Sequence, residues 1–160
     1  HGPRTGPAGS RLRGRAVHLV RDPRAVAASM MDAVRSWARA GPDFSVRDAA
    51  FLWTRAVDEA DRAKRWWGDH LTTLRYEDLR LDPKSQLKRV ATALAIVTSA
   101  RTVLHAVEEE TLIWRDGAQA GRFVRRGLID GWRTELTTEE VLVIEDVVGD
   151  RLTRFGYSRS

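Results

Sequence analysis

The sequence predicts an α/β fold in which a parallel sheet is flanked by helices, and three observations support this prediction. Short apolar runs rich in β-branched residues stand at 15–20 and 71–76, as expected of buried parallel strands. A helical pattern follows each run. The 160 residues are 42% hydrophobic and 31% charged, which suits one globular domain and excludes a disordered chain.

The sequence of residues 2–40 predicts a loop, a strand, a sharp turn and a helix, in that order. Residues 2–10 are rich in Gly, Pro and Ser and are expected to form a loop. The strand over 15–20 ends where Asp22 can cap a helix whose first turn contains Pro23. Helical spacing of apolar residues continues to about Ala40, where Gly-Pro follows.

A second helix and a second strand are expected next. The helix begins at Ser45 or Asp48 and reaches Trp67, with apolar residues repeating every three or four positions. Gly-Asp follows Trp67 and ends the helical pattern. The strand over 71–76 then alternates Leu, Thr and Tyr, residue types that favour strands.

Helices dominate the rest of the prediction. Pro83 opens a third helix, and residues 99–114 also show a helical pattern. Residues 115–136 have no clear periodicity, and the capping box TTEE at 137–140 begins a last helix. Because two parallel strands cannot stand alone, either the helical layer dominates or further sequence supplies more strands.

Charge and composition restrict the function. The net charge of +5 lies in residues 1–70, which favours an anionic ligand, although the excess of Arg over Lys can also reflect biased coding composition. Absence of Cys excludes disulfides, thiolate zinc sites and cysteine nucleophiles, and the four scattered His imply no metal. No stretch of 18 apolar residues or signal-peptide pattern occurs.

The junction after the first strand is the first candidate site. Ligands of open parallel sheets bind beyond the carboxyl ends of the strands, and Arg21 emerges at that edge. Ser29 follows eight residues later, along the next helix. The two side chains could bind one phosphate. The structural alternative is that Arg21 pairs with Asp22 or another carboxylate and that Ser29 is a small packing residue.

Two further segments carry candidate binding residues. Tyr76, in the RYEDL run, could stack on a base while the acidic residues after it orient neighbouring groups, or it could belong to the core. Arg125, Arg126 and Gly127 could direct two guanidinium groups and a backbone N–H at one anion. Adjacent arginines alone are more often a solvated surface.

Taken together, three segments resemble the second half of sulfotransferases that use 3′-phosphoadenosine 5′-phosphosulfate (PAPS). The resemblance covers residues 15–157 and rests on VHLVRDPRAVAASM, RYEDLRLDPKSQLKRVATALAI and FVRRGLIDGWRTELTTEE. It implies a P-loop NTPase-like parallel sheet flanked by helices. Residues 1–160 are then one partial domain that lacks the N-terminal strand and phosphate loop.

The resemblance also implies roles for particular residues. Arg21 and Ser29 match residues that bind the 3′-phosphate of the nucleotide, and Tyr76 matches a residue near the adenine. The late loop of the family grips the same phosphate, and its counterparts here are Arg125, Arg126 and Gly127. His1 stands at about the distance from Arg21 at which many members carry a catalytic base.

The sequence departs from the family pattern at three places. Arg126 replaces a Lys, which keeps the positive charge. Residues 130–132 read Asp-Gly-Trp, where the family has Gly-Asp-Trp. No segment matches the family's Gly-rich loop PKSGTTW, which binds the 5′-phosphosulfate and carries a Lys. His1 can also be a tag remnant or a flexible terminus.

These matches predict sulfuryl transfer from PAPS to an acceptor hydroxyl or amine, without a metal. The expected acceptor is a small molecule or a carbohydrate, in the cytoplasm, with no nucleic-acid or membrane partner; the chain could form a homo-oligomer. Two other functions stay open: an inactive fragment or degenerate domain that binds nucleotide without turnover, and a basic nucleic-acid-binding domain. A phosphoryl-transfer enzyme would need the same missing phosphate loop and a magnesium site.

Overall fold

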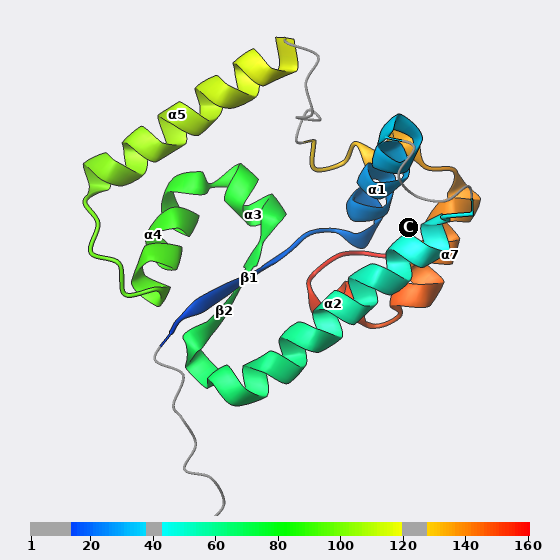
Figure 1. Cartoon of the computed structure of the whole chain (residues 1–160), viewed down its shortest axis with the longest axis horizontal. Helices are drawn as coiled ribbons and strands as arrows, with labels where there is room; N and C mark the ends of the chain where they lie inside the picture. The colour runs from blue at the N-terminus through cyan, green and yellow to red at the C-terminus, as the bar shows by residue number, and fades with distance from the viewer. Residues whose placement is uncertain (1–13, 38–42, 120–127) are drawn as a thin grey trace, which may run out of the picture.

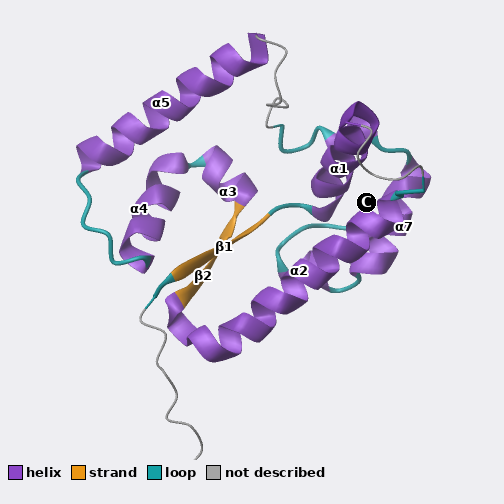
Figure 2. Cartoon of the chain, in the orientation of Figure 1, coloured by secondary structure: helices purple, strands orange, loops and turns teal. Residues whose placement is uncertain are grey.

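The computed structural model describes residues 14–37, 43–119 and 128–160, with backbone alone at 36–37 and 110–119. Two strands and a set of helices follow one another along the chain (Figures 1 and 2). Their bounds are β1 (Ala16–Val20), α1 (Pro23–Trp37), α2 (Val46–Trp67), the short 3-10 helix η1 (Gly68–His70), β2 (Leu71–Arg75), α3 (Tyr76–Leu81), α4 (Pro83–Ala93), α5 (Ala100–Gln119), α6 (Trp132–Glu135), α7 (Thr138–Val148) and α8 (Arg151–Arg154).

The described sheet contains two parallel strands, which confirms the predicted α/β class and shows that the helical layer dominates. The strands are in register from Ala16 opposite Leu71 to Val20 opposite Arg75. Helices α1 and α2 form the crossover between them. Because the strands are parallel, both carboxyl ends lie at one edge of the sheet, where Figure 1 shows α1 and α3 beginning.

Local capping bonds explain where the main helices begin. The Ser45 hydroxyl accepts from the backbone N–H of Asp48 at 3.3 Å, and the Asp48 carboxylate accepts from the Ser45 N–H at 2.9 Å. Thr137 and Glu140 form the same reciprocal capping box at α7. The Asp22 carboxylate accepts from the Arg24 N–H at 2.9 Å at the start of α1, as predicted.

Two parts of the chain differ from the prediction, 71–81 and 100–136. The second strand ends at Arg75, and Tyr76 begins α3 instead of ending the strand, because two acidic residues in the first turn favour a helix start. Helix α5 extends to Gln119, and α6 forms within 115–136, a segment without apolar periodicity. Helix α1 is described to Trp37, and its predicted end near Ala40 lies outside the described residues.

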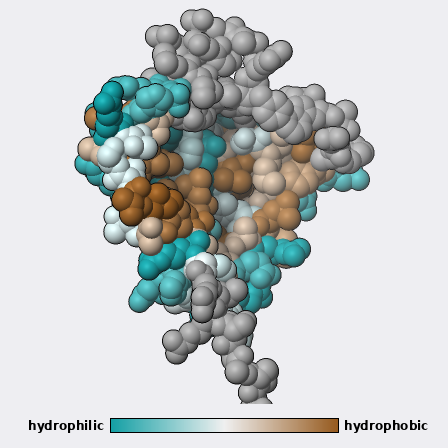
Figure 3. Space-filling model, turned by 60° about the vertical axis from the view of Figure 1, so that its left-hand side comes forward, coloured by the Kyte–Doolittle hydropathy of each residue, from teal (hydrophilic) through white to brown (hydrophobic). Residues whose placement is uncertain are grey.

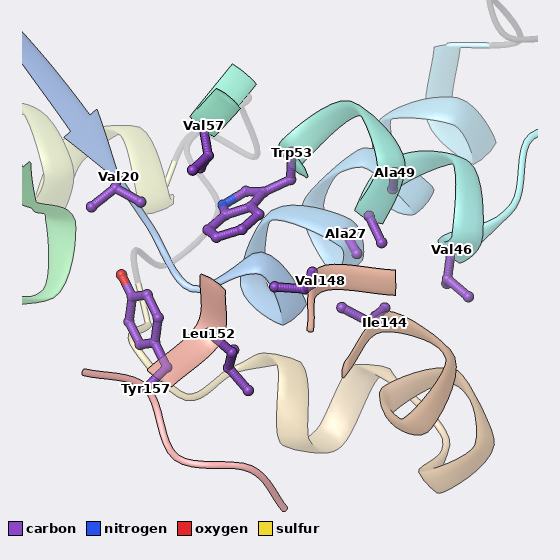
Figure 4. Packing of buried hydrophobic residues seen from close by; sticks show 11 residues of the cluster. Val20, Ala27, Val46, Ala49, Trp53, Val57, Ile144, Val148, Leu152 and Tyr157 are labelled. Carbon is purple, nitrogen blue, oxygen red and sulfur yellow. The ribbon is translucent and has the colours of Figure 1, made fainter. Parts of the chain in front are cut away.

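The main core lies where α1, α2, α7 and α8 meet the end of β1 (Figure 4). Trp53 of α2 and Tyr157 of the C-terminal segment both belong to it. A second cluster joins Ala25 and Ala28 of α1 to Trp132 and Val141. Both cores therefore pack around the first turns of α1, directly after β1, and they hold that junction in place.

The opposite side of the sheet carries α4 and α5 and is less densely covered. Helix α5 packs against α4. Figure 3 shows apolar surface on this side of the molecule, and exposed apolar side chains from this part of the chain include Leu81, Ile96 and Val97. Within the described residues, no helix combines the length and apolar character needed to cross a membrane.

Candidate functional site

Arg21 and Tyr76 meet at the carboxyl edge of the sheet. Each is the first residue after its strand, and the strand register places Val20 opposite Arg75 just before them. The Arg21 guanidinium carbon lies 4.5 Å from the centroid of the Tyr76 ring, in a cation–π contact. The structure therefore brings together two of the three predicted site residues that it describes.

The Arg21 guanidinium is incompletely paired within the described part of the chain. Its Nη2 donates to the Leu128 carbonyl at 3.4 Å, which is a long hydrogen bond. Its Nε is buried and has no hydrogen-bond partner there, and no described carboxylate forms an ion pair with it. A buried donor without an acceptor is unfavourable, so the arrangement suits an anionic ligand. Pairing with Asp22, the structural alternative for Arg21, does not occur.

Arg125, Arg126 and Gly127 lie outside the described residues, as does His1. Leu128, which directly follows Gly127 in the sequence, contacts Arg21 through its carbonyl.

Ser29 occupies a half-buried position in α1, beyond Ala25 and Ala28, which pack against Trp132. Among the described residues, it forms no hydrogen bond to Arg21 or Tyr76. The structure places Ser29 on the helix that starts at the site but does not join it to the Arg21–Tyr76 pair.

Glu77 is buried directly behind the pair. One carboxylate oxygen accepts from the Asp22 backbone N–H at 2.9 Å, and the other accepts from the Tyr157 hydroxyl at 2.8 Å. Burial, together with the hydrogen bond to Glu77, raises the pKa of Tyr157 far above its ordinary value, so the phenol stays a neutral donor. Tyr157 is a positioning group that sequence reasoning missed, since nothing local links it to residues 80 positions away.

Arg24, only three positions after Arg21, has a different environment. Its guanidinium donates to Asp22 through Nε at 3.0 Å and Nη2 at 2.7 Å, and to Glu145 through Nη1 at 2.8 Å. It also stacks on the Trp132 ring, 4.1 Å from the centroid. We call Asp22, Arg24, Trp132 and Glu145 the Arg24 cluster. This cluster joins the start of α1 to α6 and α7 next to the site.

The described part of the site places an arginine beside an aromatic ring and shows no metal centre. Among the described residues, no three His, Asp or Glu side chains gather closely enough to hold a metal ion. The fold and the site together define a helix-rich α/β protein with an arginine stacked on an aromatic ring at the carboxyl ends of its parallel strands.

Comparison with known proteins identifies the family. The sequence pattern of the sulfotransferase family matches residues 14–99, more than half of the chain, and the chain belongs to this family. The matched segment contains Arg21, Ser29 and Tyr76. Nodulation protein NoeE of Sinorhizobium fredii (strain NBRC 101917 / NGR234) is 32% identical over 97 residues, which cover 57% of this chain and 23% of NoeE. No solved structure matches the chain.

Proposed function

We propose that this chain binds the 3′-phosphate and adenine of PAPS in a sulfotransferase that moves a sulfuryl group to an acceptor hydroxyl or amine. Membership of the family supports sulfuryl transfer in general. The observation that supports this particular role is the stacked Arg21–Tyr76 pair, whose guanidinium retains a buried Nε without a described acceptor.

Two properties of the pair suit a 3′-phosphoadenosine. A guanidinium presents several N–H donors in one plane, so Arg21 can donate to two oxygens of one phosphate. Aromatic rings and guanidinium planes both stack on bases, so the Tyr76 side chain provides a surface for the adenine. The Tyr76 ring covers one face of the Arg21 guanidinium and keeps water from it. Because the local dielectric is then lower, the attraction between Arg21 and a phosphate is stronger.

The remaining roles follow the family resemblance and belong to the same proposal. Ser29, Arg125, Arg126 and Gly127 complete the contacts to the 3′-phosphate, and His1 accepts the proton of the attacking acceptor. The acceptor oxygen or nitrogen forms a bond to sulfur while the bond from sulfur to the bridging phosphate oxygen breaks. The product nucleotide is adenosine 3′,5′-diphosphate.

The proposed setting is a P-loop NTPase-like domain in the cytoplasm, where a phosphate loop outside these residues binds the 5′-phosphosulfate. Its acceptor is a small molecule or a carbohydrate. Phosphate-binding loops of such domains lie at the carboxyl edge of the sheet, which is the edge where Arg21 and Tyr76 meet.

Calorimetric titration with adenosine 3′,5′-diphosphate and with 5′-AMP tests the proposal. We expect the diphosphate to bind at least about tenfold more tightly, because one charge-assisted contact contributes about 1.5–3 kcal/mol. Arg21→Ala is expected to weaken diphosphate binding about 10–100-fold. Arg62→Ala, which removes an exposed guanidinium paired with Glu59 on α2, is the matched control and leaves binding unchanged.

Other outcomes would assign a different function. Equal affinity for the two nucleotides would exclude a 3′-phosphate site. Salt-dependent binding of any oligonucleotide, with no preference for the diphosphate, would indicate a nucleic-acid-binding domain. Tight diphosphate binding without turnover of PAPS by the 160-residue chain would indicate a nucleotide-binding domain that needs further sequence for catalysis.

A further inference from the structure

The peptide group between Arg21 and Asp22 is held from both sides by buried side chains. Its carbonyl, on Arg21, accepts from the indole Nε1 of Trp53 at 2.9 Å. Its N–H, on Asp22, donates to Glu77 Oε1 at 2.9 Å. Because the two groups of a trans peptide point in opposite directions, Trp53 and Glu77 fix the orientation of this peptide plane.

The same two chain segments carry the candidate site. Arg21 precedes Asp22, and Tyr76 precedes Glu77, so the hydrogen bond from Asp22 to Glu77 lies one residue beyond the stacked pair. The other Glu77 oxygen accepts from Tyr157, which belongs to the main core shown in Figure 4. Glu77 therefore connects the backbone beside Arg21 to the core.

We propose that Glu77 is a positioning residue which, with Trp53, fixes the 21–22 peptide group and so holds the Arg21 guanidinium over the Tyr76 ring. The proposal rests on the proposed function for its effect on nucleotide binding. Its claim about the geometry of Arg21 is independent of any ligand.

The position of the carboxylate oxygens, not their charge, carries this role. Glu77 is 5% exposed, and both of its oxygens accept from neutral donors at 2.8 and 2.9 Å. The Arg75 guanidinium is farther away: its Nε lies 4.0 Å from Oε2 of Glu77, and its Nη1 lies 3.7 Å from Oδ1 of Asp78. A neutral side chain of the same length should therefore keep the position of Arg21, whereas a carboxylate on a shorter side chain should not.

Two conservative variants separate reach from charge. Glu77→Gln keeps an oxygen at the same distance for the Asp22 N–H, and its amide can donate to the Tyr157 oxygen. Glu77→Asp keeps the negative charge, but its side chain is one methylene shorter, so the carboxylate lies farther from the Asp22 N–H and the Tyr157 hydroxyl. Asp58→Asn is the matched control, since Asp58 accepts two bonds from Arg151 at 2.9 and 3.0 Å, between α2 and α8.

Two readouts are measured on the 160-residue chain. The first is the NMR resonance of the Arg21 Nε–H without ligand, which the ring current of Tyr76 displaces; Tyr76→Leu supplies the value without a ring. The second is the ratio of the dissociation constants of 5′-AMP and adenosine 3′,5′-diphosphate. Both report the position of Arg21, and a general loss of stability would not move them in the same way.

We expect Glu77→Asp to shift the Arg21 resonance toward its position in Tyr76→Leu and to lower the affinity ratio about tenfold, because small displacements of a binding group are costly. Glu77→Gln and Asp58→Asn are expected to change the ratio less than about twofold. If Glu77→Asp does not fold, Trp53→Phe is used instead, because it removes the indole N–H that donates to the Arg21 carbonyl. The Arg21 resonance and the affinity ratio then test whether the fixed peptide group positions Arg21.

Two results would overturn the proposal. An unchanged Arg21 resonance in Glu77→Asp would show that the reach of the carboxylate does not position the guanidinium. A loss in Glu77→Gln with retention in Glu77→Asp would show that charge is what matters. If the unsubstituted chain shows no preference for the diphosphate, the proposed function fails, and the resonance alone still decides the positioning role.

Discussion

Arg21 and Arg24 stand three positions apart at the same junction, yet the protein uses them differently. Arg24 is 3% exposed and gives its guanidinium to two carboxylates and the Trp132 ring. Arg21 is half-buried, and its described contacts are the Tyr76 ring and one long hydrogen bond. The Arg24 guanidinium is paired by carboxylates, whereas the Arg21 guanidinium keeps N–H donors without an acceptor among the described residues.

The difference separates an arginine that is paired within the protein from one that we propose binds a ligand. A buried charge is tolerated when carboxylates and hydrogen bonds surround it, and its removal then leaves those partners uncompensated. A guanidinium without a carboxylate partner contributes little to folding but can attract an anion. Stability measurements should therefore distinguish the Arg24 cluster from the Arg21–Tyr76 pair without any ligand.

The largest effect is expected for Arg24→Ala. The change leaves the buried carboxylates of Asp22 and Glu145 without their cation and removes the group stacked on Trp132. We expect the free energy of unfolding to fall by about 3–5 kcal/mol, measured by urea denaturation. A loss below about 1 kcal/mol would show that the Arg24 cluster does not support the fold.

A smaller loss is expected for Tyr157→Phe, which tests the link between the site and the core. The variant keeps the ring in its buried place but removes the hydroxyl that donates to Glu77 at 2.8 Å. One buried carboxylate oxygen is left without this donor, so unfolding should require about 1–3 kcal/mol less. Urea denaturation measures the change, and a variant as stable as the parent would argue that water replaces the hydroxyl.

Arg21→Ala should affect stability less than either change. It removes a cation–π contact and one long hydrogen bond, which together contribute about 0.5–1 kcal/mol. The same variant is the one expected to lose nucleotide affinity. If the loss of unfolding free energy instead equalled that of Arg24→Ala, both arginines would be structural and the distinction between them would fail.

The smallest effect concerns His18 of β1 and its dependence on pH. Burial is the main cause that lowers the pKa of His18 in the folded protein, with Asp61 opposing and Arg154 adding to it. The unfolded chain then binds a proton at a higher pH than the folded one, so the stability from this residue falls as pH drops through the ordinary value of about 6.5.

Substitution of this histidine isolates its share of the pH dependence. Thermal unfolding of the parent chain and of His18→Gln is compared at about pH 7.5 and pH 5, on either side of the ordinary histidine value. We expect the parent to lose more stability on acidification than His18→Gln does. Equal losses would mean that the carboxylates alone account for the acid sensitivity.

Local sequence patterns were sufficient for much of the fold and for part of the site. The two strands were predicted to within a residue, and the Thr137–Glu140 capping box was readable because caps involve neighbours in the chain. Ser45 and Asp48 were predicted as alternative starts of α2, and the structure shows that they form one capping box. Arg21 and Tyr76 were predicted to share one edge because parallel strands place their carboxyl ends together.

By itself, the sequence thus determined the α/β class, the starts of α1, α2, α4 and α7, and the strand ends beside which the candidate site forms, because strand patterns and helix caps depend on residues close together in the chain. Only the tertiary structure decided that Arg24 is surrounded by carboxylates while Arg21 contacts none among the described residues, because Glu145 reaches Arg24 from 121 positions away. It likewise assigned Glu77 to the 21–22 peptide group, 55 positions distant. Burial and pairing of charges depend on contacts between distant segments, and no local pattern encodes which segments meet.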